Sequence, residues 1–318
     1  MPNNVHPQVQ AMLDRATAMG IPAIHSLSTK DARALVETLA TSRRESYPAP
    51  AVPDVQNTTT GAGYSHVPVR IYRMTKDPAA PVIVYFHGGG HVFGSLDSFD
   101  TTARFLARST GCTLVSVDYR MAPEHPFPAA PLDCYDATRW VADHAAQLQV
   151  DPARLAVCGD SAGGNLATVV ALMARDSGAF SVSAQALVYP VIDYRGGTPS
   201  YDRYGVGYGI LEAQTAVWFA DRYLPDVGAH QDWRASPGLA GSHKGLPPTL
   251  VLTAECDILH DEGVTYAAQL EAAGVMVERA NFPGMIHGFF GYLGLVDDAA
   301  RAHETVARFL HGVWGAPG

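Results

Sequence analysis

The sequence predicts an α/β protein with a mostly parallel central sheet flanked by helices. Short apolar segments alternate with helical segments along most of the 318 residues, and this alternation is typical of a parallel sheet with right-handed crossovers. Two segments, 82–86 and 113–117, are apolar almost throughout, as strands covered on both faces are. Parallel sheets of this kind bind ligands at the carboxyl ends of their strands. We therefore expect the functional residues at that edge of the sheet.

The composition is that of a globular chain with a substantial core, since 47% of the residues are hydrophobic and 17% are charged. A net charge of −9 and the absence of a basic cluster argue against a nucleic-acid partner. No apolar run approaches the ~20 residues that cross a bilayer, and the first residues lack the pattern of a signal peptide. The four cysteines are scattered and are expected to be reduced. We therefore expect a cytoplasmic protein that does not contact membranes.

Two helices are expected before the first strand. Residues 6–20 place apolar side chains on one face, and a second helix begins at Ser28 or Thr29, either of which is a good N-cap. Residues 47–55 are rich in proline and are expected to form a linker. The expected division is N-terminal cap helices in 1–50 and an α/β-type catalytic domain in 51–318.

The core elements then follow in order. The expected strands are 67–72, 82–86, 113–117, 155–158, 184–189, 249–253 and 275–279, and the expected helices are 99–109, 131–146, 162–175, 262–273 and 297–311. Residues 191–246 break the alternation with a glycine-rich stretch and a short amphipathic helix at 211–223. A long aromatic-rich excursion is typical of a lid or substrate wall, so we expect 191–246 to contribute a cap insertion. A merely decorative insertion is the alternative.

Residues 154–167 contain the motif Gly-x-Ser-x-Gly between an apolar segment and a helix of small residues. In a nucleophile elbow the serine occupies a strained position between strand and helix, so the residues two places away must be small. Ser161 would then stand at a helix N-terminus, where backbone N–H groups stabilise negative charge. An ordinary glycine-rich turn is the alternative, and the rest of the chain has to decide between them.

A catalytic serine needs a base, and the base needs a group that fixes its tautomer. After an elbow serine, the acid and then the histidine follow in chain order. His287 follows a predicted strand and lies between glycines, although a solvated loop histidine is the alternative. Asp257 lies past a strand end and is preferred over Glu255 and Asp261, because Asp261 belongs to the acidic first turn of a helix. The predicted catalytic residues are Ser161, Asp257 and His287.

A run of three glycines, Gly88 to Gly90, follows His87 and the predicted strand 82–86. Glycines leave their backbone N–H groups open to a ligand. A flexible turn is one interpretation. The other is an oxyanion hole completed by the N–H of Ala162, the residue after the nucleophile. His87 is expected to hold the loop by hydrogen bonds.

Taken together, these motifs resemble the bacterial hormone-sensitive lipase family of carboxylesterases over about residues 45–315. The resemblance rests on 87–90, 119–129, 159–164, 257–263 and 286–289. It implies an α/β-hydrolase core with the N-terminal helices in a cap and a triad of Ser161, His287 and Asp257. It also implies that Gly88, Gly89 and Ala162 supply the oxyanion donors.

The resemblance implies a serine carboxylesterase that hydrolyses short-to-medium-chain esters through an acyl-enzyme. Neither a metal nor an organic cofactor is expected, and the expected partner is a small-molecule ester; homodimers are common among such folds. An amidase with the same triad is the alternative activity. A non-catalytic receptor on the same fold is a further alternative, but it should lack a member of the triad.

Two positions depart from the family pattern. His91 follows the glycines where an aromatic or aliphatic residue is common, so a more polar pocket mouth is expected. Ile258 follows Asp257 where proline is frequent, which slightly changes the stiffness of that loop. In the 119–129 loop, Arg120 and Glu124 are expected to form a buried pair. This pair would support the loop that contains Gly88 to Gly90, here called the glycine loop.

Overall fold

Eight strands form a single sheet in the computed structural model, which describes residues 4–315. The order is β1-β2-β4-β3-β5-β6-β7-β8; β2 pairs antiparallel with β1 and with β4, and the other pairings are parallel. The strands are β1 Asp54–Thr59, β2 Pro68–Arg73, β3 Ala80–Phe86, β4 Thr113–Val117, β5 Val150–Asp160, β6 Ala184–Val188, β7 Thr249–Cys256 and β8 Val277–Ile286. The prediction of a mostly parallel sheet is confirmed.

Alternating side chains of the central strands enter two separate apolar cores. In β3, Val82, Val84 and Phe86 belong to one core, while Ile83 and Tyr85 belong to the other. This division follows from the period of two in a strand, which sends successive side chains to opposite faces. All five side chains are buried, as the continuous apolar sequence predicts.

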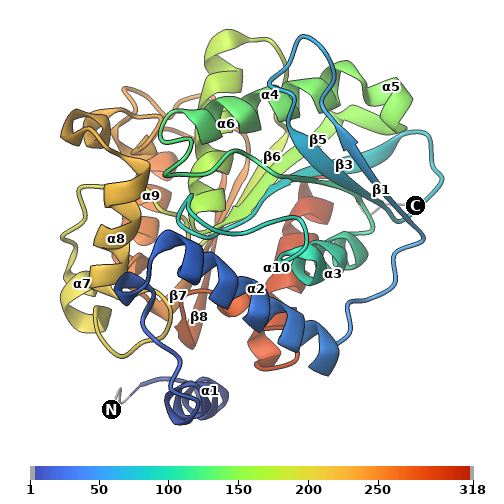
Figure 1. The fold of residues 1–318 in the computed structure, drawn as a ribbon. Helices are drawn as coiled ribbons and strands as arrows, with labels where there is room; N and C mark the ends of the chain where they lie inside the picture. Colours follow the sequence, from blue (N-terminus) through green and yellow to red (C-terminus); the bar gives the residue numbers. More distant parts are fainter. Residues whose placement is uncertain (1–3, 316–318) are drawn as a thin grey trace.

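Helices cover both faces of the sheet (Figure 1). One core includes residues of α3 (Asp100–Thr110) and α10 (Asp297–Trp314). The other includes residues of α4 (Ala129–Asp143), α5 (Ala145–Leu148), α6 (Ala162–Ser177) and α9 (His260–Ala272). The sheet is therefore the middle layer of three, and its strand ends are free to carry loops.

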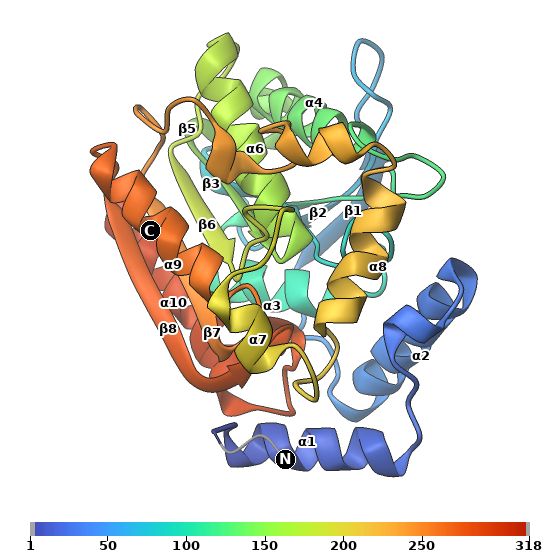
Figure 2. The same cartoon turned by 90° about the vertical axis from the view of Figure 1, so that its left-hand side faces the viewer.

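A further group of helices lies beside the carboxyl ends of the strands (Figure 2). It consists of α1 (Pro7–Ala18), α2 (Thr29–Ser46), α7 (Pro199–Tyr204) and α8 (Ala213–Tyr223). Two hydrogen bonds join α8 to α2 and to the residues just before α2. Trp218 Nε1 donates to Leu27 O at 3.1 Å, and Arg222 Nε donates to Thr29 Oγ1 at 3.1 Å. Ser28 caps α2 by accepting a hydrogen bond from the Asp31 N–H at 3.1 Å.

Most expected elements are present with shifts of a few residues at their ends, and two differences concern the edges of the sheet. The segment expected to be a linker, 47–55, leads into β1, which the sequence did not predict. The strand expected at 275–279 is β8, which continues to Ile286. β1 is polar and largely exposed, and the apolar residues of β8 are interrupted by Glu278, Arg279, Asn281 and Pro283, so neither strand has the continuous apolar pattern of a buried strand.

Candidate active site

Ser161 lies in a strained turn between β5 and α6. Its backbone has φ 58° and ψ −120°, and its N–H donates to Val188 O of the neighbouring strand at 2.9 Å. A Cβ on Gly159 would lie 2.2 Å from Gly163 O, and one on Gly163 would lie 1.9 Å from Phe86 O. Glycine is therefore required on both sides of the serine. The turn has the geometry of a nucleophile elbow.

The three residues predicted to be catalytic lie together at the carboxyl ends of β5, β7 and β8. His287 Nε2 is 2.8 Å from Ser161 Oγ, and His287 Nδ1 is 2.7 Å from Asp257 Oδ2. A carboxylate can only accept, so Nδ1 carries the proton and Nε2 accepts from the Ser161 hydroxyl when the ring is neutral. The three are buried, with 8%, 2% and 6% exposure for Ser161, Asp257 and His287. The arrangement can remove the serine proton.

Local contacts hold the acid and the base of this group. Asp257 Oδ1 accepts a hydrogen bond from the Leu259 N–H at 3.0 Å, which leaves Oδ2 for the imidazole. Gly288 follows the histidine with φ 86°, a left-handed turn that carries the chain away from β8. The ring of Tyr189 lies against His287, with centroids 4.7 Å apart. The imidazole is therefore held on one side by a carboxylate and on another by a buried aromatic ring.

The first glycine of the glycine run is held by the residue that precedes the serine. Gly88 N–H donates to Asp160 Oδ1 at 3.1 Å, and the Tyr85 hydroxyl donates to the same oxygen at 2.6 Å. Burial raises the pKa of Asp160 to about 6, although these hydrogen bonds oppose the shift. The N–H of Gly88, one of the predicted oxyanion donors, is therefore already bound to a carboxylate and is not open to a further acceptor.

Three neighbouring N–H groups lack an acceptor within the described chain: those of Gly89, Gly90 and Ala162. Gly89 and Gly90 have φ of 114° and 61°, which are left-handed values. A Cβ on Gly89 would lie 2.0 Å from Phe93 O, and one on Gly90 would lie 2.2 Å from the ring of Phe219. Two of the predicted donors, Gly89 and Ala162, thus have available N–H groups, and Gly90, which sequence reasoning did not single out, has one as well.

Asp160 is a second residue that sequence reasoning missed. It occupies the variable position of the Gly-x-Ser-x-Gly motif, where no residue type is required. An acidic residue at the end of an apolar strand was the available signal. Burial of a carboxylate requires partners, and unpaired N–H groups of a nearby glycine loop are suitable partners.

The residues after the glycine run lie inside an aromatic cluster. His91 is buried and stacks on Tyr223 with ring centroids 3.8 Å apart. Neither ring nitrogen of His91 has a hydrogen-bond partner within the described residues, and burial lowers its pKa to about 3. The expectation that His91 makes a pocket mouth more polar is wrong, because this side chain is covered.

Arg120 and Glu124 do not pair with each other. Arg120 binds Asp133 through Nε and Nη2, at 2.9 and 2.7 Å. Glu124 binds Arg33 of α2 through both oxygens, at 2.8 and 2.7 Å, and this contact lowers the pKa of Glu124 to about 2. The predicted pair is therefore wrong, because each side chain has a partner on another element.

A surface groove of about 940 Å³ lies away from these residues. Residues of α3, α10 and 47–51 line it, and Ser161, Asp257 and His287 do not. The chemistry-bearing side chains are those at the strand ends.

None of the helices in residues 4–315 has the length and apolar character needed to span a bilayer.

Comparison with known proteins assigns the family. A family model described as the alpha/beta hydrolase fold matches residues 83–291. The chain is 43% identical to an ethyl acetate hydrolase of Pseudomonas putida over 256 residues, which are 79% of this chain and 80% of that protein. It is 42% identical to the carboxylesterase NlhH of Mycobacterium tuberculosis over 259 residues, covering 78% of this chain and 80% of the relative.

Solved structures agree over nearly the whole chain. A hyperthermophilic esterase from Pyrobaculum calidifontis superposes with a TM-score of 0.91 at 38% identity, covering 99% of both chains. An ester hydrolase from the metagenome of Lake Arreo superposes with a TM-score of 0.92 at 36% identity, covering 98% of this chain and 99% of the other. The protein belongs to the α/β-hydrolase fold family, in its bacterial hormone-sensitive lipase branch.

Proposed function

We propose that this protein is a serine carboxylesterase that hydrolyses short-to-medium-chain esters through an acyl-enzyme. The observation that carries the proposal is the chain of contacts from Ser161 Oγ to His287 Nε2 and from His287 Nδ1 to Asp257 Oδ2, at 2.8 and 2.7 Å. The names of two relatives, an ethyl acetate hydrolase and a carboxylesterase, support it. The catalytic residues proposed are Ser161, His287 and Asp257.

Acylation begins with attack of Ser161 Oγ on the ester carbonyl carbon. His287 Nε2 takes the hydroxyl proton, and the Asp257 carboxylate stabilises the imidazolium that results. The tetrahedral intermediate collapses, the carbon–oxygen bond to the alcohol breaks, and His287 returns the proton to the leaving alkoxide. Ser161 is then esterified by the acyl group.

Deacylation repeats these steps with water. His287 Nε2 accepts a proton from the water as its oxygen attacks the acyl carbonyl, and Ser161 Oγ leaves with that proton. The carboxylic acid is released and the resting hydrogen bonds re-form. The same imidazole therefore serves as base and as acid in both halves of the reaction.

The oxyanion donors proposed are the N–H groups of Gly89, Gly90 and Ala162. They are available because no described residue accepts from them, and Ala162 also begins α6, whose N-terminus favours negative charge. Each such donor contributes about 3 kcal/mol to transition-state stabilisation.

The proposed function is tested by Ser161→Ala. We expect a loss of kcat of about 10⁴-fold or more on nitrophenyl esters with an unchanged thermal unfolding midpoint, since the side chain is small and the fold does not depend on its hydroxyl. Wild type should also be labelled covalently by an organophosphate and the variant should not. Normal turnover by a folded Ser161→Ala protein would overturn the mechanism.

Substrate class requires a separate pair of assays. A series of nitrophenyl esters of increasing acyl length should show a maximum at short or medium chains, because Phe219 of α8 packs against the glycine loop at Gly90 and Phe93. Each ester should be compared with its amide. Comparable turnover of the two would favour the amidase alternative.

The N-terminal helices and the long insertion lie together beside the strand ends (Figure 2). We propose that 1–50 and 191–246 form a cap over a catalytic domain of 51–318, supported by the hydrogen bonds that join α2 and its preceding loop to α8.

We also propose a homodimer, for which the partly exposed edge strand β8 offers a pairing surface. A cytoplasmic location fits the four buried cysteines, which are free thiols.

A further inference from the structure

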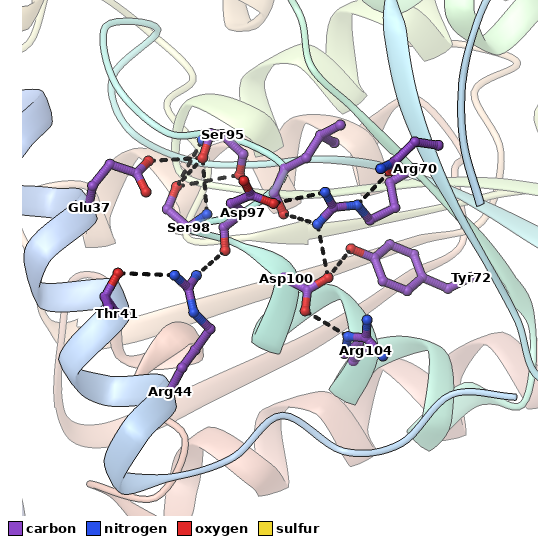
Figure 3. A network of polar contacts seen from close by, with 12 residues as sticks. Glu37, Thr41, Arg44, Arg70, Tyr72, Ser95, Asp97, Ser98, Asp100 and Arg104 are labelled. Carbon is purple, nitrogen blue, oxygen red and sulfur yellow. Dashed lines mark hydrogen bonds and ion pairs between the residues drawn. The ribbon is translucent and has the colours of Figure 1, made fainter. Parts of the chain in front are cut away.

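Helix α2 carries a row of polar side chains that contact loops of the α/β domain. Ser95 Oγ donates to Glu37 Oε1 at 2.8 Å, and Arg44 donates to Asp97 O and to Thr41 Oγ1 (Figure 3). Ser95 and Asp97 lie in the segment that leaves the glycine loop. α2 is thus joined to that segment by two hydrogen bonds, while the contact of Arg44 with Thr41 lies within the helix.

Arg33, one end of this row, binds the glycine loop itself. Its Nε donates to Val92 O at 2.8 Å, and its Nη2 donates to Ala122 O at 2.9 Å. The outer edge of the guanidinium binds the Glu124 carboxylate. Three donor groups in one plane therefore meet two backbone carbonyls and one carboxylate, a geometry that only arginine provides.

The two carbonyls belong to the framework of the glycine loop. The N–H groups of Val92 and Phe93 donate to Gly89 O at 3.0 and 3.1 Å, which closes a turn around Gly89 and Gly90. Ala122 N–H donates to His91 O at 2.9 Å. Arg33 therefore completes a closed set of hydrogen bonds around the residues whose N–H groups we assign to the oxyanion hole.

Arg43, further along the same helix, contacts the loop of the catalytic histidine. Its Nη1 donates to Gly291 O, and its guanidinium lies 5.4 Å from the ring centroid of Tyr292. The Tyr292 hydroxyl is 3.5 Å from His287 O, to which it donates. One helix thus contacts the glycine loop through Arg33 and the histidine loop through Arg43.

We propose that α2 sets the distance between the oxyanion loop and the catalytic histidine, with Arg33 and Arg43 as its positioning residues. This inference rests on the proposed function. Ten residues of helix span about 15 Å without internal freedom, so the two contacts are fixed relative to each other. A displacement of about 1 Å in a catalytic group can cost about 100-fold in rate.

Arg33→Gln tests the glycine-loop contact. We expect kcat to fall about 10- to 100-fold while KM changes less than about threefold, because the variant misplaces donors that act mainly in the transition state. The inhibition constant of a trifluoromethyl ketone, which forms an oxyanion on Ser161, should rise by the same factor. Arg33→Lys should show the same loss, since an ammonium cannot span both carbonyls.

Glu124→Gln is the matched control. It removes the ion pair of Arg33 but leaves the bonds to Val92 O and Ala122 O, so kcat should stay within about twofold of wild type. Full activity of Arg33→Lys would assign the effect to charge and overturn the proposal. A loss of activity in Glu124→Gln equal to that in Arg33→Gln would overturn it as well.

Hydrogen exchange supplies a readout that does not depend on turnover. Amide exchange in 87–95 should accelerate in Arg33→Gln, while exchange in 286–292 stays at the wild-type rate. In Arg43→Gln, exchange in 286–292 should accelerate, while exchange in 87–95 stays at the wild-type rate. Unchanged exchange and kcat in both variants would refute the inference. If wild type hydrolyses no ester, the proposed function fails, and these exchange rates still decide whether α2 positions the two loops.

Discussion

Asp160 is a buried acid that accepts hydrogen bonds from the Gly88 N–H and from the Tyr85 hydroxyl. Its folded pKa is raised to about 6 by burial, above the unfolded value of about 3.9. The folded state therefore holds this proton more tightly than the unfolded state does. Its contribution to stability is fully present below about pH 4 and is lost as pH rises through about 6. Ionisation of Asp160 at neutral pH therefore lowers the stability of the folded state.

Two substitutions separate these effects at residue 160. Asp160→Asn keeps an acceptor for Gly88 N–H and the Tyr85 hydroxyl, so its kcat should stay within about tenfold of wild type. Its stability relative to wild type should be higher at pH 8 than at pH 4, as measured by chemical denaturation. Asp160→Ala loses the acceptor and should have a lower kcat than Asp160→Asn. Equal kcat in the two variants would show that the carboxylate does not position the loop.

The convergence of the three proposed catalytic residues was predictable from sequence for a physical reason. Ser161, Asp257 and His287 each follow an apolar strand, and parallel strands end on one edge, so their convergence follows from topology. The choice among glycines was not predictable, because it depends on which N–H the Asp160 carboxylate occupies. The contacts of Arg33 were not predictable either, because its acceptors are backbone carbonyls 59 and 89 residues away along the chain.

At the scale of elements, α8 covers the glycine loop with an aromatic side chain. Phe219 is 7% exposed, its ring is 5.3 Å from that of Phe93, and a Cβ on Gly90 would overlap it. Phe219→Ala removes this cover and leaves space beside the oxyanion loop. We expect kcat/KM for longer acyl chains to rise relative to short ones, in the nitrophenyl ester series.

Val217→Ala serves as the control for that prediction. Val217 lies on the same helix but is 59% exposed, so its truncation should leave the chain-length profile unchanged. A profile that shifts equally in both variants would mean that α8 acts through its general stability. A profile unchanged in Phe219→Ala would remove α8 from the acyl site.

Burial also explains which elements the sequence revealed. β3 and β4 lie in the middle of the sheet, and every residue in them is buried, so their apolar runs were sufficient. β1 lies at an edge and has the exposed sequence Asp-Val-Gln-Asn-Thr-Thr. It is held by its antiparallel register with β2, and backbone pairing of this kind leaves no signature in side-chain type.

At the scale of the molecule, buried neutral histidines determine the response to acid. Burial lowers the pKa of His87 to about 4 and those of His91 and His303 to about 3. The unfolded state binds protons at about pH 6.5 that the folded state does not. Stability from these groups is therefore fully present above about pH 6.5 and is lost progressively as pH falls toward 3. Asp160 opposes this trend, but only between about pH 6 and 4.

His91→Phe isolates one of these protons. Phenylalanine keeps the stacking on Tyr223 and loses no hydrogen bond, because the His91 nitrogens have no partner among the described residues. The free energy of unfolding should therefore fall less steeply on acidification between about pH 6 and 4, by about 1.4 kcal/mol per pH unit. Urea denaturation of wild type and variant across this range measures the two slopes. Parallel slopes would mean that His91 is protonated in the folded protein, and the acid response would then have to come from His87 and His303.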